Sequence, residues 1–216
     1  MTRSPPPAQD RLSRTAWLAG PAAALLFFAS LILFAALRED GYTHGTKAVS
    51  ELGAVGAPMA GAFNLAGLIL PGAAIMLFGY GLLALSRRRA GAVLMIGSGA
   101  MLALSGLFAV DMEDLGAATS ALHALGAMGA GLLWAAGLFA IRPVLAERPG
   151  LESWARATPW FLLFMIVHLG WQVAFQATGA LLPGWGQRIG FFGYFLWFAA
   201  TGLLLLREEG RGAGRA

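Results

Sequence analysis

Three histidines and one aspartate are the residues of this chain with the clearest potential for chemistry. His44, His123, His168 and Asp111 are of the types that hold zinc in hydrolases, where the metal activates a bound water molecule. Neither His-x-x-x-His nor His-Glu-x-x-His occurs, so each ligand would have to come from a different segment. The chain has no cysteine, which excludes thiolate metal sites and disulfides. Zinc is therefore a possible cofactor only if these four side chains converge in space.

A second set of polar side chains lies within one apolar stretch. His168, Gln172 and Gln176 recur every four residues, which places them on one face of a helix. A polar side chain that faces lipid within a membrane span is costly, so we expect this stripe to face other helices. It forms either interhelical hydrogen bonds or one wall of a pocket.

The elements that would position these residues are six apolar stretches, each long enough to cross a hydrocarbon core of about 30 Å as a helix. The chain has 216 residues, of which 58% are hydrophobic and 12% charged, so no room remains for a soluble domain. The sequence predicts an all-α polytopic membrane protein, a six-transmembrane-helix bundle over residues 15–206. Pro71 would bend the second helix and open space beside Asn64. The apolar stretches are residues 16–37, 60–85, 90–110, 119–141, 159–177 and 189–206.

The fifteen Lys and Arg residues are sorted between the two sides of this bundle. The first, third and fifth loops contain only Arg38, Lys47 and Arg188, and the other twelve lie in the tails and in the second and fourth loops. The positive-inside rule then predicts that both termini lie in the cytoplasm. The tails, residues 1–14 and 207–216, have little apolar surface and are predicted to be disordered in the cytoplasm.

Composition also bears on partners. Arginines beside helix ends favour membrane lipids, because anionic headgroups lie at that depth. The sequence has no basic patch with interleaved aromatic residues, so nucleic acid is not expected as a partner. Pairs such as Gly99 with Ala103 and Gly126 with Ala130 have the small-xxx-small spacing of closely packed membrane helices. These pairs fit either a tight monomer or a homodimer through the fourth span.

With this topology, the polar side chains of the spans fall mostly toward their outer ends. We expect them to line a pocket open to the outer face, with the Ser50–Glu51 segment as its lid. Glu51 or Asp111 would pair with Arg188 and so neutralise charge near the interface. The predicted pocket residues are Ser50, Glu51, Asn64, Asp111, His123, His168, Gln172 and Arg188.

One segment of the first loop resembles a known family. The run from Val49 to Pro58, Val-Ser-Glu-Leu-Gly-Ala-Val-Gly-Ala-Pro, is followed at once by an apolar helix with Phe63-Asn64. It resembles the prokaryotic membrane-protein family known as domain of unknown function 998. Asp111, His123 and Gln187-Arg188 are similar to the rest of that family's pattern. The resemblance covers roughly residues 20–206 and implies a small multi-pass protein of a bacterial or archaeal cytoplasmic membrane.

A weaker likeness is to the membrane hydrolases that include alkaline ceramidases and adiponectin-receptor-like proteins. Those enzymes hold zinc among three histidines, an aspartate and a serine. Ser50, Asp111, His44, His123 and His168 match that set in kind. The chain differs in having six predicted spans instead of seven and no paired histidines in its last helix.

Three functions follow from these observations. The first is the binding of a lipid headgroup or small amphiphile in the polar pocket, without chemistry and without a cofactor. The second is a zinc-dependent intramembrane hydrolase of lipid amides or esters. The third is a proton-coupled small-molecule carrier that uses Glu51, Asp111 and the histidines. We favour the first, because the metal-ligand spacings and a buried acid pair are both missing from the sequence.

Overall fold

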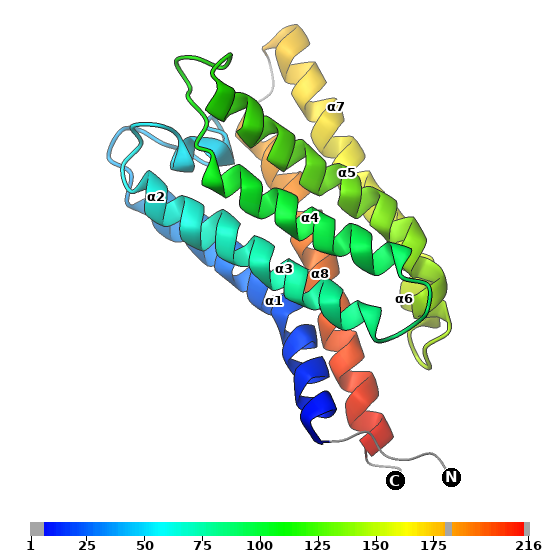
Figure 1. Cartoon of the computed structure of the whole chain (residues 1–216). Coiled ribbons are helices and arrows are strands. Elements are labelled where there is room, and N and C mark those ends of the chain that lie inside the picture. Colours follow the sequence, from blue (N-terminus) through cyan, green and yellow to red (C-terminus); the bar gives the residue numbers. More distant parts are fainter. Residues whose placement is uncertain (1–6, 180–182, 214–216) are drawn as a thin grey trace.

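Six helical segments of the structure are long and apolar enough to cross a membrane, as the sequence predicts. The structure is a computed structural model that describes residues 7–179 and 183–213, and its regular elements in these ranges are all helical (Figure 1). A short 3-10 helix, η1 (Val49–Gly53), lies in the first loop. The spans are α1 (Pro7–Ala36); α2 (Ala60–Phe63), η2 (Asn64–Ile69) and α3 (Leu70–Leu83); α4 (Ala90–Leu107); α5 (Ala118–Ala146); α6 (Glu152–Ala157), η3 (Thr158–Phe161) and α7 (Leu162–Thr178); and α8 (Pro183–Ala213).

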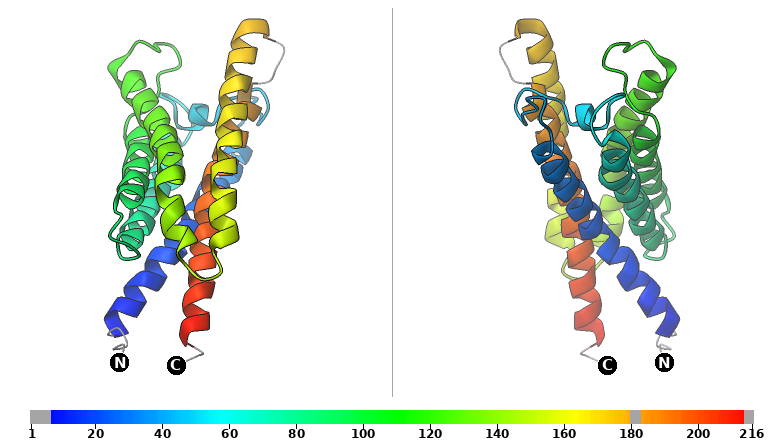
Figure 2. Two further views of the ribbon diagram at one scale, coloured as in Figure 1. Left: turned by 90° about the vertical axis from the view of Figure 1, so that its right-hand side faces the viewer. Right: turned by 90° about the vertical axis from the view of Figure 1, so that its left-hand side faces the viewer.

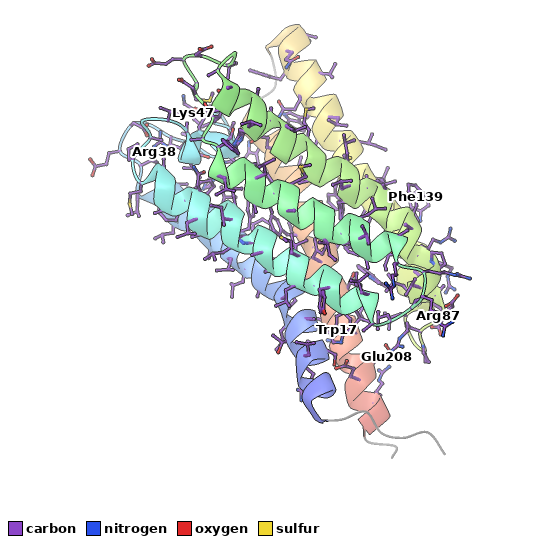
Figure 3. The ribbon with its side chains drawn as sticks, viewed as in Figure 1. Trp17, Arg38, Lys47, Arg87, Phe139 and Glu208 are labelled. Carbon is purple, nitrogen blue, oxygen red and sulfur yellow. The ribbon has the colours of Figure 1, made fainter. Side chains whose placement is uncertain are left out.

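The spans pack side by side in the order α5, α4, α3, α1, α8 and α7. Both ends of the chain lie at one end of the bundle, together with the α3–α4 and α5–α6 connections (Figures 1 and 2). We call this the terminal end, and the opposite end, which carries η1 and the α4–α5 connection, the distal end. Arg87 and Glu208 lie at the terminal end, and Arg38 and Lys47 lie at the distal end (Figure 3). The arginine-rich loops therefore share one end, and its assignment to the cytoplasm stays a prediction.

The first and last helices are longer than the sequence predicts. Residues 7–14 and 207–213 are helical, whereas we expected disordered tails there, and residues 1–6 and 214–216 lie outside the described residues. Proline is tolerated in the first turn of a helix, so the run that ends at Pro7 does not prevent α1 from starting there. The α8 extension is held at both of its acidic residues. Trp17 Nε1 donates to Glu209 Oε1 at 2.7 Å, and Arg148 Nη2 lies 2.9 Å from Glu208 Oε1.

The small residues of the spans allow close backbone contact within the chain. A Cβ atom added to Gly72 would lie 2.6 Å from the Gly99 carbonyl oxygen and 2.7 Å from the Ala103 nitrogen, so α3 and α4 touch along this pair. Pro71 is accommodated by a π-helical stretch, η2, directly before α3. The small-xxx-small pair of the fourth stretch is also used inside the monomer, because Gly126 of α5 contacts the backbone of Ser105.

Candidate functional site

A cavity of about 480 Å³ lies among α4, α5, α7 and α8, beneath η1. Most of its lining is apolar, and no Asp, Glu, Lys or Arg is among its described lining residues. The volume is in the range typical of small-molecule sites, roughly 300 to 1,000 Å³. Its polar lining residues are Ser50, Ser105, His123, His168, Gln187 and Tyr194.

The cavity opens sideways, between α5 and α7. These two helices diverge toward the distal end (Figure 2) and are not among the closely packed neighbours in the bundle. Met128 and Leu132 of α5 and Leu169 of α7 line the cavity, yet are 64%, 62% and 54% exposed. We call these three residues the side opening. Because both helices are membrane-span candidates, the side opening faces the depth at which lipid chains lie.

The distal end of the cavity is covered by η1, whose position is fixed by side chains from three other elements. Gln187 Oε1 of α8 accepts from the Val49 backbone N–H at 2.7 Å, and Arg38 Nη1 donates to the Glu51 carbonyl at 3.0 Å. Asn64 Nδ2 donates to the Gly53 carbonyl at 2.9 Å. The backbone of η1 is thus tied to the segment that follows α1, to η2 and to α8, and it forms a roof whose residue Ser50 lines the cavity.

Asn64 does not line the cavity, in contrast to the prediction. It is buried and its amide lies directly on Gly53, where an added Cβ atom would overlap Asn64 Oδ1. The expected space beside Asn64 is therefore filled by η1. The reason is local: the glycine of the Ser50-Glu51-Leu52-Gly53 segment is the position at which the roof can approach η2 closely.

The hydrogen-bond partners of Arg188 are neutral groups, whereas we predicted a carboxylate partner. It is only 9% exposed, and its guanidinium donates to the Lys47 carbonyl at 2.9 Å, to Tyr42 Oη at 2.7 Å and to His44 Nδ1 at 3.2 Å. A fourth bond goes to the Gly184 carbonyl of its own helix at 2.9 Å. Arg188 thus fixes the first loop to α8 instead of facing the cavity.

The two carboxylates expected to pair with Arg188 have other partners. Glu51 Oε2 lies 3.1 Å from Lys47 Nζ, and Glu51 Oε1 accepts from the Ala48 backbone N–H at 2.8 Å. Asp111 Oδ1 accepts from the backbone N–H groups of Glu113 and Asp114 at 2.9 and 3.2 Å. Both carboxylates satisfy backbone groups of their own segments, Asp111 as short acidic side chains do in turns and Glu51 by capping the start of η1. Neither lines the cavity.

His123 faces the cavity with a defined tautomer. Its Nδ1 lies 2.8 Å from the Ser105 carbonyl oxygen and 3.1 Å from that of Phe108, and both are backbone atoms at the end of α4. Carbonyl oxygens only accept hydrogen bonds, so Nδ1 must carry the proton. In the neutral ring Nε2 is then an acceptor.

His168 is placed by the packing of α7 on a glycine-lined face of α8. A Cβ atom added to Gly190 would lie 3.0 Å from His168 Cβ, and one added to Gly186 would lie 2.9 Å from Trp171 Cδ1. The His168 Nδ1 atom is buried and has no hydrogen-bond partner among the described residues. The predicted polar stripe of α7 is therefore only partly correct. His168 lines the cavity, whereas Gln172 is half-buried outside the lining.

The inner wall of the cavity contains two buried aromatic side chains, Tyr194, which is hydrogen-bonded to Ser98, and Trp134. Ser98 Oγ donates to the Ala130 carbonyl at 2.8 Å, so the Tyr194 hydroxyl, 2.7 Å away, donates to Ser98 Oγ. Trp134 stacks obliquely on Tyr194 with ring centroids 5.3 Å apart. Trp134 is 1% exposed, and its Nε1 has no partner among the described residues. An unpaired donor of this kind is unusual in a folded core.

The four predicted metal ligands do not form one site. His123 and His168 line the cavity, but His44 is bound to Arg188 above the roof and Asp111 to its own loop. Among the described residues, no three His, Asp or Glu side chains form a group that could hold a metal ion. The zinc ligand set His44, His123, His168 and Asp111 is therefore not assembled, because His44 is bound to Arg188, His123 to carbonyls at the end of α4, and Asp111 to its own loop.

The first loop should be sensitive to acid through His44. Burial and the adjacent Arg188 guanidinium lower the pKa of His44 below its ordinary value of 6.5, and Nδ1 must stay unprotonated to accept from Arg188. The stability contributed by neutral His44 is thus fully present above about pH 6.5 and is lost as the pH falls through the lower pKa of the folded state. Thermal midpoints measured from pH 8 to pH 5 should fall more for the wild type than for His44→Gln, whose Oε1 accepts without titrating. Parallel pH profiles for the two proteins would contradict this assignment.

Several site residues were missed in the sequence. Nothing in the sequence identifies Trp134 and Tyr194 as site residues, because aromatic residues occur both in contact with lipid and inside a helix bundle. Ser98 is one of several small polar residues in apolar helices. Gln187 was noted as part of the family pattern but was not placed in the pocket, although it is a polar residue beside Arg188 at the start of a span.

The comparison with curated proteins and the comparison with solved structures each gave no match. A family described as "Protein of unknown function (DUF998)" matches residues 21–204. The match runs from the second turn of the apolar part of α1 to the last turns of α8, and it includes the roof, the cavity lining and the side opening. The description states no activity. This chain belongs to the DUF998 family of membrane proteins.

Proposed function

We propose that the protein binds an amphiphile of the membrane, which reaches the cavity through the side opening between α5 and α7. The observation that carries this proposal is an uncharged, mostly apolar cavity whose mouth consists of exposed apolar side chains on two membrane-span helices. An apolar chain in that cavity would replace contacts with other lipids by contacts with α5, α7 and α8.

The fixed roof supports access from the side. Arg38, Asn64, Gln187 and the network around Arg188 hold η1 and the first loop over the distal end of the cavity. A ligand that came from the distal aqueous phase would have to break several of these hydrogen bonds, each worth about 1 kcal/mol or more. Movement along the membrane needs none of them to break. The pocket that we expected to open at the outer face is therefore proposed to open into the membrane.

The test is whether the purified protein retains lipid in the cavity. Gly131 of α5 lines the cavity next to Met165 of α7, since an added Cβ atom would lie 2.9 Å from Met165 Cε, and the substitution Gly131→Phe should place a ring in the cavity between α5 and α7. We expect lipid that remains bound after detergent exchange, measured by mass spectrometry, to fall at least about tenfold in this variant, the loss that removing roughly 1.4 kcal/mol of binding free energy produces.

The matched control is Leu125→Phe, which adds the same side chain at an exposed position of α5 outside the cavity lining. It should retain lipid like the wild type, and both variants should keep their thermal midpoints. A second blocking variant, Ala127→Phe, guards against a folding defect in the first. Equal lipid retention in the wild type, both blocked variants and the control would overturn the proposal.

Hydrolysis and proton-coupled transport stay predictions from the sequence. The hydrolase would need metal ligands that converge, and the carrier would need acidic groups along a path. In the described part of the chain, the candidate ligands are separated and Asp111 and Glu51 face their own loops. The geometry gives more support to binding than to either of these.

A further inference from the structure

The charged side chains near the cavity are bound to other groups of the protein, and this restricts the ligands that the cavity can bind. Arg188 donates to three groups of the first loop, and Lys47 pairs with Glu51. The described lining has no Asp, Glu, Lys or Arg. A charged headgroup placed in such a cavity would lose its hydration without gaining a counter-charge, which costs several kcal/mol.

The lining does offer neutral hydrogen-bonding atoms of both kinds. His123 Nε2 is an acceptor in the tautomer set by the carbonyls at the end of α4, and Trp134 Nε1 is a donor that is buried just behind the cavity surface. The Gln187 side chain uses its Oε1 on Val49, which leaves its amide N–H groups as donors. A hydroxyl group can donate and accept, so it matches this mixture, whereas a phosphate or a carboxylate can only accept.

The positions of these atoms also orient a ligand. Trp134 and Tyr194 are almost completely buried on the inner walls, while the side opening consists of Met128, Leu132 and Leu169. A polar end placed among the inner-wall atoms would leave the apolar chain to pass out through the side opening.

We infer that the ligand of this cavity is an amphiphile with an uncharged, hydroxyl-bearing polar end, such as an acylglycerol or a long-chain alcohol, bound with that end inward. This inference rests on the proposed function, since it names the class of amphiphile that the same cavity takes. It differs from the sequence prediction of a lipid headgroup bound through Arg188 and Glu51, because those residues hold the roof.

The experiment compares three probes that share one oleoyl chain: monooleoylglycerol, oleate at pH 8 and oleoylcholine. Each is added in isotopically labelled form to the full-length protein in detergent, excess probe is removed by detergent exchange and gel filtration, and the label retained per protein is measured. We expect the uncharged probe to bind at least about tenfold more tightly than either charged one, as a site with no counter-charge requires. Trp134→Phe, which keeps a ring against Tyr194 but removes the N–H donor, should weaken binding of monooleoylglycerol by about tenfold.

Three results would count against the inference or a part of it, and they differ in meaning. If oleate or oleoylcholine binds as tightly as monooleoylglycerol, or more tightly, the cavity takes amphiphiles but the inference of an uncharged polar end is wrong. If Gly131→Phe retains each probe as well as the wild type, the cavity is not the binding site and the proposed function fails with it. An unchanged affinity in Trp134→Phe would exclude the indole N–H as the recognising donor.

Discussion

Arg188→Ala is expected to lower the free energy of unfolding by about 3 kcal/mol or more and to release the first loop from α8. The guanidinium is 9% exposed and donates to Tyr42, His44 and the Lys47 carbonyl. Its loss leaves these acceptors without their donor at a site that water reaches poorly. Lys47 lies two residues before the start of η1, so the roof of the cavity should loosen as well.

The effect of Arg188 also depends on its planar geometry. Tyr42 lies beneath two guanidinium groups, with its ring centroid 5.3 Å from Arg38 Cζ and 5.9 Å from Arg188 Cζ, and it donates to the Ala48 carbonyl at 3.1 Å. Burial raises the pKa of Tyr42, so its hydroxyl stays protonated and keeps that bond at neutral pH. A lysine has a single ammonium and cannot supply the same fork of donors. Arg188→Lys should therefore recover only part of the loss.

These changes are measured as thermal midpoints in detergent and as hydrogen exchange of residues 42–53. The control is Arg87→Ala, since Arg87 is exposed at the terminal end (Figure 3). It should match the wild type in both measurements. If Arg188→Ala and Arg87→Ala have the same midpoint, Arg188 does not hold the first loop.

Gly193→Ala is expected to separate α7 from α8, at a cost of about 3 kcal/mol. A Cβ atom at this position would overlap both Cβ and Cγ of Phe164, and Cβ is fixed to the backbone of α7. The described residues of α7 include no fully buried side chain, and α8 is its principal neighbour. The helix therefore has few other contacts to keep it in place.

Detachment of α7 would also remove one wall of the cavity, so lipid retention should fall together with stability. This separates Gly193→Ala from Gly131→Phe, for which retention falls while the thermal midpoint is kept. Hydrogen exchange of residues 162–178 reports the position of α7 directly. The control is Gly170→Ala on α7 itself, where an added Cβ atom meets nothing within 4 Å. Protection of α7 that is equal in the two variants would show that the glycine face of α8 does not position this helix.

Much of the fold could be predicted from the sequence because membrane spans are recognised by length and composition. The six apolar stretches correspond to the six spans, and the sorting of Arg and Lys placed the same loops together at one end. The ends of α1 and α8 were wrong, because hydropathy does not detect helices that extend beyond the apolar stretch. The last turns of α8 are held by polar contacts such as that of Glu209 with Trp17, which have no periodic pattern.

The site was harder to predict. The spacing of polar residues shows which of them share a face of a helix, but it does not show which other helix or cavity that face contacts. The stripe of His168 and Gln172 identifies a side of α7, yet only His168 meets the cavity, since α7 crosses α8 at the Gly190 position. Arg188 was assigned a carboxylate partner on grounds of charge. Its actual partners include backbone carbonyls and a tyrosine, which no side-chain pattern reveals. The apolar lining carries no signal at all, because a residue such as Met128 suits lipid and ligand alike.

The binding of an amphiphile between α5 and α7 is tested most directly by photocrosslinking in nanodiscs, with a monooleoylglycerol that carries a diazirine on the chain carbons nearest its glycerol. We expect label on Trp134 and Tyr194, which are 1% and 5% exposed, and loss of that label in Gly131→Phe. Label confined to outward-facing side chains such as Leu125 and Phe139 (Figure 3), or unchanged in Gly131→Phe, would contradict the account.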